Sequence, residues 1–214
     1  MILPRDYISY SAASLWYQNK SAFRGKYYLP GALGGISSPQ MDFGKEIADM
    51  IKDDPENPLV AHIPKYEIRD QGFTVPIEDI PVLMYPDTLS LIGTPKFREY
   101  KTSEWVDGKP SWTQKKVDEH MQIKLYSLGI KEQYGAVDDL CHLDWLVTKM
   151  EDVTDGIKIN GKQYGSTIQL PRMTGDIISF PCVVTEMERY RAREWIVQAA
   201  HEIEADYKNF KKNV

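Results

Sequence analysis

Three groups of polar residues near the middle of the chain have the types and spacing of a divalent-metal site. Pro86-Asp87 precedes one apolar run, Glu99-Tyr100-Lys101 closes the next, and Gln122 lies four residues before Tyr126. Two carboxylates and a backbone carbonyl form the hard oxygen set that Mg²⁺ or Mn²⁺ prefers, with water and a phosphate oxygen in the remaining positions. A lysine in the same site could orient the attacking water and offset charge in the transition state. This combination predicts metal-assisted cutting of a phosphodiester bond.

The context of Glu99 and Lys101 matters more than their spacing. An acidic residue two positions before a lysine occurs three times in the chain, and the other two instances lie at a predicted turn and in a predicted helix. In a strand, residues two apart face the same side, so Glu99 and Lys101 are expected to project together. Pro86-Asp87 is the only Pro-Asp in the chain, and a hairpin could place its carboxylate against Glu99. The alternative is a turn aspartate beside an exposed cross-strand ion pair worth ~0.2–1 kcal/mol.

Local patterns predict the elements that would position these residues. Helical spacing of apolar residues, with Ser11 as one N-cap, predicts helices within residues 8–28, 41–52, 111–134 and 186–210. Short β-branched and aromatic runs predict strands within residues 65–101, 141–150 and 176–184, with a hairpin turn at Asn160-Gly161. The predicted fold class is therefore α/β (α+β), with a mixed central sheet flanked by helices.

Length and composition are typical of one domain over residues 1–214. The hydrophobic content of 42% is enough for a sizeable core. Residues 31–40, rich in Gly, Pro and Ser, predict a flexible loop. No apolar run of about eighteen residues is present, and the start of the chain lacks the order of a signal peptide, so we expect no membrane and a cytoplasmic location. The two cysteines are too few for a disulfide scaffold or a four-thiolate metal site.

The net charge of −5 argues against a protein that coats nucleic acid by bulk electrostatics. An enzyme that gathers carboxylates around a metal ion needs only a local basic track for phosphates. Candidates for this track are Lys20, Arg24, Lys26, Lys96, Arg98, Lys109, Lys115, Lys116, Lys124, Lys208, Lys211 and Lys212. The alternative for each is a solvated surface charge.

In order along the chain, these motifs resemble the PD-(D/E)XK nuclease superfamily, specifically its RecB-like branch. The resemblance rests on Pro86-Asp87, on Glu99-Tyr100-Lys101-Thr102 and on the Gln122 to Tyr126 step. The opening ISYSAASLW (8–16) resembles the start of those nucleases, and Phe43-Gly44-Lys45-Glu46-Ile47 resembles their first helix motif. The similarity covers residues 8–126.

The resemblance implies a restriction-endonuclease-like core and a Mg²⁺- or Mn²⁺-dependent deoxyribonuclease. It makes Asp87 and Glu99 metal ligands, Tyr100 a ligand through its carbonyl, and Lys101 the catalytic lysine. Gln122 and Tyr126 would line the active site and touch the DNA backbone. DNA is then the partner, and we expect an exonuclease of recombination, repair or phage DNA processing, in the host cytoplasm if the chain is phage-encoded. A homo-oligomer stays an open alternative.

Departures from the family pattern affect the metal site. The branch often has a histidine four residues after Gly44, and Ala48 stands there. Glu46 could substitute as an acidic ligand, and plain helix surface is the alternative. Some relatives carry four cysteines for an iron-sulfur cluster, but Asn19-Lys20-Ser21 stands where the first would lie, so no cluster is expected.

Two other function classes stay open: a restriction-type endonuclease, and a non-catalytic nucleic-acid-binding module with the same fold. The four histidines show no zinc-binding spacing, although His120 comes shortly before Gln122 on the predicted active-site helix. Glycine-rich phosphate loops and serine nucleophile elbows are absent from the sequence.

Overall fold

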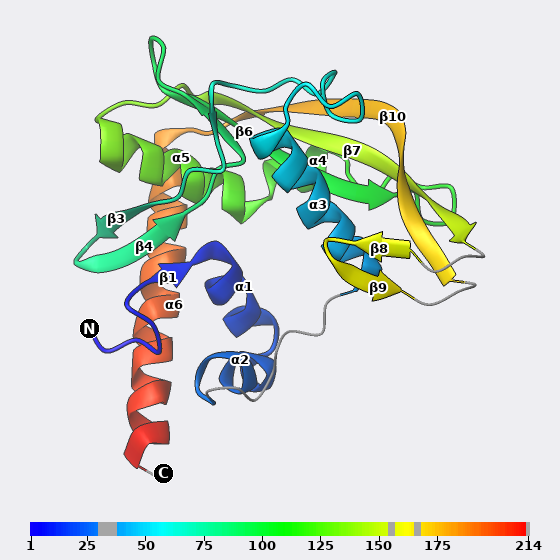
Figure 1. The fold of residues 1–214 in the computed structure, drawn as a ribbon. Coiled ribbons are helices and arrows are strands. Elements are labelled where there is room, and N and C mark those ends of the chain that lie inside the picture. The colour runs from blue at the N-terminus through cyan, green and yellow to red at the C-terminus, as the bar shows by residue number, and fades with distance from the viewer. Residues whose placement is uncertain (30–37, 154–156, 165–167, 213–214) are drawn as a thin grey trace.

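The protein is a mixed α+β chain in which helices flank two mixed sheets (Figure 1). The computed structural model describes residues 1–29, 38–153, 157–164 and 168–212. Its elements are β1 (Ile8–Ser9), α1 (Tyr10–Gln18), α2 (Lys20–Tyr27), α3 (Pro39–Asp53), β2 (Ile68–Arg69), β3 (Phe73–Ile77), β4 (Ile80–Met84), β5 (Thr88–Ser90), β6 (Lys96–Glu104), α4 (Gln114–Asp118), α5 (Met121–Tyr134), β7 (Leu140–Val153), β8 (Ile157–Ile159), β9 (Lys162–Tyr164), β10 (Ile168–Val183) and α6 (Glu186–Lys212). Residues 31–37 of the predicted loop lie outside the described ranges, and residues 39–40 already belong to α3.

The larger sheet has the strand order β10-β7-β6-β5-β2, with β6 and β7 parallel and the other neighbours antiparallel. A parallel pair needs a crossover connection, and α4 and α5 provide it here. The second sheet has the order β1-β4-β3, with β1 parallel to β4. The predicted single central sheet is therefore two sheets. The separation falls between β4 and β5, where Pro86 lacks the N–H that a continuing ladder would use.

Alternate residues of β6 and β7 face two separate cores. Phe97 and Trp145 belong to the large core with α5 and α6, while Leu146 packs with the α3 residues Phe43 and Ile47. Helix α3 lies across β6 and β10 on that second face (Figure 1). The large-core face of β6 is therefore the one that meets α5.

Two predicted helix boundaries were wrong. The N-cap of α1 is Ser9, whose Oγ accepts from the backbone N–H of Ala12, and not Ser11. The predicted helix over 111–134 is two helices, α4 and α5, because the backbone of His120 is extended and His120 is the N-cap of α5. Lys115 and Glu119 consequently lie outside α5 and form an exposed pair at 4.0 Å.

The helix predicted within residues 8–28 is two helices, α1 and α2, divided at Asn19, and the remaining predicted elements are confirmed. Helix α3 and helix α6 match the apolar spacing, and strands β2 to β7 and β10 follow the apolar runs. Asn160-Gly161 joins β8 to β9 with positive φ at both residues, as a type I′ hairpin turn requires. Within the described ranges, no helix combines the length and apolar composition needed to cross a membrane.

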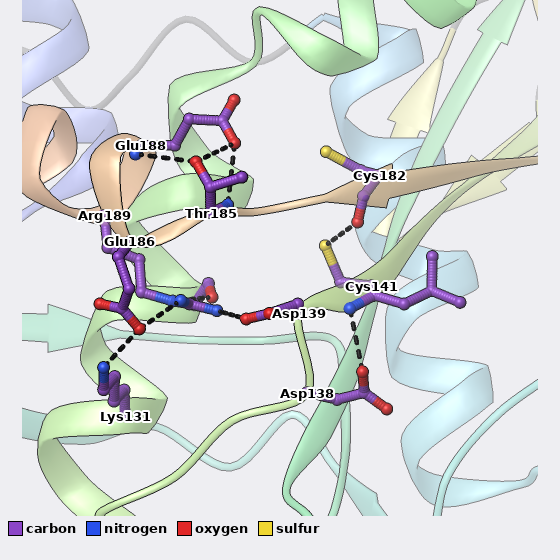
Figure 2. Close-up of polar contacts among 11 residues, drawn as sticks. Lys131, Asp138, Asp139, Cys141, Cys182, Thr185, Glu186, Glu188 and Arg189 are labelled. Carbon is purple, nitrogen blue, oxygen red and sulfur yellow. Dashed lines mark hydrogen bonds and ion pairs between the residues drawn. The ribbon is translucent and has the colours of Figure 1, made fainter.

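Buried Arg189 anchors α6 to the rest of the chain. It donates to Ser127 of α5 at 3.0 Å and to Glu186 at 2.8 Å, and it also pairs with Asp139, just before β7. Figure 2 shows Arg189 between these two carboxylates. Nearby, Cys141 donates from its thiol to the Cys182 carbonyl oxygen at 3.3 Å. Both cysteines are buried, free thiols in strands, as the sequence predicted.

Candidate active site

The end of β6 brings Glu99 and Lys101 onto one face, as the strand pattern predicted. Lys101 Nζ donates to Glu99 Oε1 at 2.7 Å and to Gln122 Oε1 of α5 at 2.9 Å. The Glu99 side chain is 3% exposed and that of Lys101 is 26% exposed. The pair is therefore largely buried, which excludes the alternative of an exposed surface ion pair.

Helix α5 closes the network with two residues one turn apart. Gln122 Nε2 donates to Glu99 Oε1 at 2.7 Å and to the Tyr126 hydroxyl at 3.0 Å. Both side chains are buried, and their four-residue spacing places them on one helix face. We refer to Asp87, Glu99, Lys101, Gln122 and Tyr126 as the cluster.

Asp87 joins the cluster from the segment between β4 and β5. Its Oδ2 accepts from the backbone N–H of Tyr100 at 2.6 Å. Pairing of β5 with β6 ends at Thr88 and Arg98, and the N–H and C=O of one strand residue project toward the same neighbour. The carbonyl of Tyr100 therefore points toward the edge occupied by Asp87, where β5 no longer pairs with β6. The Tyr100 hydroxyl lies elsewhere and donates to the Pro64 carbonyl at 2.6 Å.

The electrostatics show two carboxylates that share one lysine. Burial raises the pKa of Asp87 well above its usual range, and the neighbouring Glu99 raises it further. Burial would lower the pKa of Lys101, but the charges of Glu99 and Asp87 outweigh burial and raise it. Lys101 is therefore positively charged at neutral pH. Glu99 Oε2 is buried and has no hydrogen-bond partner among the described residues, which is costly unless another group contacts it.

These residues fit a divalent cation that keeps several of its waters. The buried carboxylate of Glu99 with one unsatisfied oxygen, the partly buried carboxylate of Asp87 and a nearby backbone carbonyl match the donor types of Mg²⁺ and Mn²⁺. Within the described part of the chain, no three His, Cys, Asp or Glu side chains gather as a metal-binding group. The site could therefore hold an ion through few protein ligands.

Glu46, predicted as an additional ligand, is not brought to Asp87 and Glu99. Burial raises the pKa of Glu46, and the positive charge of Arg172 on β10 lowers it in part. The charged group near Glu46 is therefore Arg172 of the sheet. Gly44, Ile47 and Ala48 are the residues of α3 on the side of the cluster. A helix rotates by about 100° per residue, so Glu46 points away from the direction of Gly44 and Ala48.

The cluster lies between two hollows. The first, which we call the cleft, has a volume of about 330 Å³ and is lined by Asp87, Tyr100, Lys101, Thr102, Gly44 and Ala48. The second, which we call the groove, has a volume of about 500 Å³ and is lined by Gln122, Tyr126 and residues of the N-terminal segment, including Arg5, Ser9, Tyr10 and Lys26. The cleft reaches Asp87 and Lys101, and the groove reaches Gln122 and Tyr126.

Gly44 allows α3 to approach β6 closely at the wall of the cleft. A Cβ at this position would lie 2.8 Å from Thr102 Oγ1, which is too close for ordinary contact. The glycine in the first helix motif thus has a packing reason in this chain. Ala48, one turn later, keeps the cleft open where a larger side chain would fill it.

His120 lies beside the cluster without a hydrogen bond to it. Its ring packs against Tyr10 at 5.7 Å and Trp112 at 5.2 Å between centroids, and its Nδ1 is buried without a partner among the described residues. Burial, together with the charges of Lys101 and Lys116, lowers the pKa of His120 to about 4. The imidazole is therefore neutral at physiological pH.

Half of the predicted basic track is paired with carboxylates. Lys20 pairs with Glu202 at 3.2 Å, and Arg24 makes a two-point contact with Asp206. Further pairs join Arg98 to Asp144, Lys115 to Glu119, Lys124 to Glu188, and Lys208 to Glu204. Arg5, which the sequence analysis missed, lies in the groove with Lys26. The signal that could have found it is its place just before the opening motif at residues 8–16.

Comparisons with known proteins leave the site to be interpreted from its own geometry. No protein-family model matches the chain, and no curated protein matches it. Solved structures that match include one described as "Crystal structure of SSO0001", with 10% sequence identity, a TM-score of 0.44, and coverage of 93% of this chain and 77% of the other. A likeness of this size supports no statement about function.

Proposed function

We propose that this protein is a metal-dependent nuclease with the restriction-endonuclease-like core of the PD-(D/E)XK superfamily and its RecB-like branch. The observation that supports the proposal is the buried network of Glu99, Lys101, Gln122 and Tyr126 beside Asp87, with Glu99 Oε2 unsatisfied. A purely structural ion pair would not be expected to have a second, partly buried carboxylate beside it and a carboxylate oxygen without a partner.

Asp87 and Glu99 would hold Mg²⁺ or Mn²⁺, with the carbonyl of Tyr100 as a third oxygen. When bound, the ion would activate a water molecule and offset charge on the phosphate. Lys101 uses two of its three donors on Glu99 and Gln122 within the described chain, and it lines the cleft. Its remaining N–H can therefore donate to the attacking water or to a phosphate oxygen.

Gln122 acts as a positioning residue. It accepts from Lys101, and it donates from Nε2 to Glu99 and to Tyr126, so it fixes the two groups that flank it. Tyr126 accepts from Gln122, and its own O–H is left to donate into the groove. Of these two residues, Tyr126 is thus the one suited to contact a phosphate.

We infer DNA as the substrate and an exonuclease as the mode of cleavage, in recombination, repair or phage DNA processing. Both points rest on the resemblance of the motifs to the RecB-like branch. The test is incubation of end-labelled linear DNA and closed circular DNA with Mg²⁺ or Mn²⁺, using the wild type, Lys101→Ala and Asp87→Ala. An exonuclease degrades only the linear DNA, whereas a restriction-type endonuclease also cuts the circle at defined positions. Full activity in both variants, with native far-UV circular dichroism, would exclude the proposed site.

A second candidate is a non-catalytic nucleic-acid-binding module with the same fold. The observation that favours it is the lack of a third acidic side chain beside Asp87 and Glu99 in the described part of the chain. Titration calorimetry with Mn²⁺ separates the two. An active site takes up Mn²⁺ in a way that depends on Asp87 and Glu99, and a scaffold without activity shows no such uptake.

A further inference from the structure

The groove contains two cations that share one aromatic ring. Arg5 Cζ lies 4.8 Å and Lys26 Nζ lies 5.4 Å from the centroid of the Tyr27 ring. Each contact is a cation–π interaction. Since both cations approach the same ring and line the groove, the groove carries two positive charges beside Tyr27.

Neither cation has a carboxylate partner within the described ranges. The contrast with the rest of α2 is direct, because Lys20 is paired with Glu202 and Arg24 with Asp206. An anion in the groove is attracted by both charges. In a chain of net charge −5, such an uncompensated pair produces a local positive potential that attracts anions.

Hydroxyl groups line the path from this pair to the cluster. Arg5 contacts the hydroxyl of Tyr7 at 3.2 Å, and the hydroxyls of Ser9 and Ser11 lie 3.1 Å apart. These three residues line the groove with Tyr126. Arginine, lysine and hydroxyl side chains are the groups that usually contact phosphate and sugar in protein–nucleic-acid complexes.

We infer that Arg5 and Lys26 of the groove bind a phosphate of the nucleic-acid strand. The scissile bond of the same strand lies at the cluster. Arg5 supplies a planar fork that matches phosphate oxygens, and Lys26 supplies a compact charge. This inference rests on the proposed function for its substrate, and the phosphate is either internal to the strand or at its end. Lys101 lines the cleft and donates to Gln122, which lines the groove with Tyr126. In this inference the strand therefore runs from the cleft, across the cluster, into the groove.

The test measures binding separately from cleavage. A labelled single-stranded oligonucleotide is titrated, in EDTA, with the wild type, Arg5→Gln, Lys26→Gln and the double variant, over a range of salt concentrations. One phosphate contact on a single strand contributes about 0.7 to the slope of log affinity against log salt, so the double variant, which loses that contact, is expected to lose about 0.7. Lys211→Gln is the matched control, since Lys211 Nζ lies 4.7 Å from the Tyr207 ring on α6 and lines no part of the groove.

Two further arms make the result specific. Arg5→Lys keeps the charge and is expected to keep the salt slope, which a variant that merely disturbs folding would not do. Oligonucleotides with and without a 5′-phosphate identify the source of the ligand. If the groove binds a terminal phosphate, the double variant is expected to bind oligonucleotides with and without the 5′-phosphate equally. If it binds an internal phosphate, the double variant is expected to lose the same affinity for both oligonucleotides.

The inference is overturned if the folded double variant keeps the wild-type affinity and salt slope. It fails separately from the proposed function, because binding in EDTA requires no cleavage. If the wild type cleaves DNA with Mg²⁺ or Mn²⁺, the double variant is also expected to raise KM several-fold with little change in kcat, since a distant phosphate contact contributes equally to the ground and transition states. An unchanged KM overturns the inference while leaving the nuclease in place.

Discussion

Replacing Lys101 with methionine removes the cation that the carboxylates of Glu99 and Asp87 share. Lys101→Met keeps the length of the side chain but leaves Glu99, 3% exposed, and the partly buried Asp87 without this positive neighbour. Breaking a buried ion pair by removing one partner costs roughly 3–5 kcal/mol. Because the Lys101 side chain is 26% exposed, we expect the lower end of that range. For a chain of this length that corresponds to a Tm lower by about 6–12 °C.

The assay is thermal and chemical unfolding of Lys101→Met in EDTA and in saturating Mn²⁺. The uncompensated carboxylates bind the cation more tightly in the variant, and ligand that binds only the folded state raises stability. Mn²⁺ is therefore expected to raise the Tm of Lys101→Met more than that of the wild type. Cleavage is expected to fall by about 10²–10³ or more, as when a transition-state donor is lost.

Arg189→Met is the matched control for this prediction. It also removes a buried cation, at 2% exposure, but on α6 and away from the cleft and the groove. We expect lower stability, no added response to Mn²⁺, and cleavage close to wild type below the Tm. If Lys101→Met leaves the Tm unchanged in EDTA, or if Mn²⁺ shifts neither protein, the account of two carboxylates sharing a lysine is refuted.

The other predictions concern single residues near the cluster. The pKa of Asp87 is raised in the folded state, so its contribution to stability falls as pH rises from about 3.9, the unfolded value, through the folded pKa. Asp87→Asn should remove this loss, raise stability in EDTA at neutral pH and abolish cleavage. Denaturation at several pH values measures the change in stability. A Cβ at Gly44 would lie 2.8 Å from Thr102 Oγ1, so Gly44→Ala should lower the Tm and Gly44→Ala/Thr102→Ala should recover it; equal loss in both would contradict the contact. The pKa of His120 is lowered to about 4, so NMR should show it titrating far below pH 6.5. Because the unfolded pKa is about 6.5, the free energy of unfolding should fall as pH drops below that value. A normal titration near pH 6.5 would show that the ring is not held as described.

Several features of the site could be predicted from the sequence because they depend on local periodicity. Side chains alternate in a strand, so Glu99 and Lys101 had to share a face once β6 was recognised. Positions four apart share a helix face, so Gln122 and Tyr126 had to lie together on α5. The turn at Asn160-Gly161 followed from residues that accept positive φ.

The tertiary structure alone decided which of these local faces meet. The break before α5 at His120 was not predicted from the apolar spacing, which continues across it. Glu46 had the residue type of a ligand but lies by the sheet cation Arg172.

The basic residues show the same division. Sequence identified Lys20, Arg24 and Lys26 as equivalent candidates on one segment. Residues of α6, about 180 positions away, neutralise the first two, whereas Lys26 instead shares a ring with Arg5. Periods of two and 3.6 residues are properties of the backbone and can be read locally; which charges become paired depends on where the chain packs against itself.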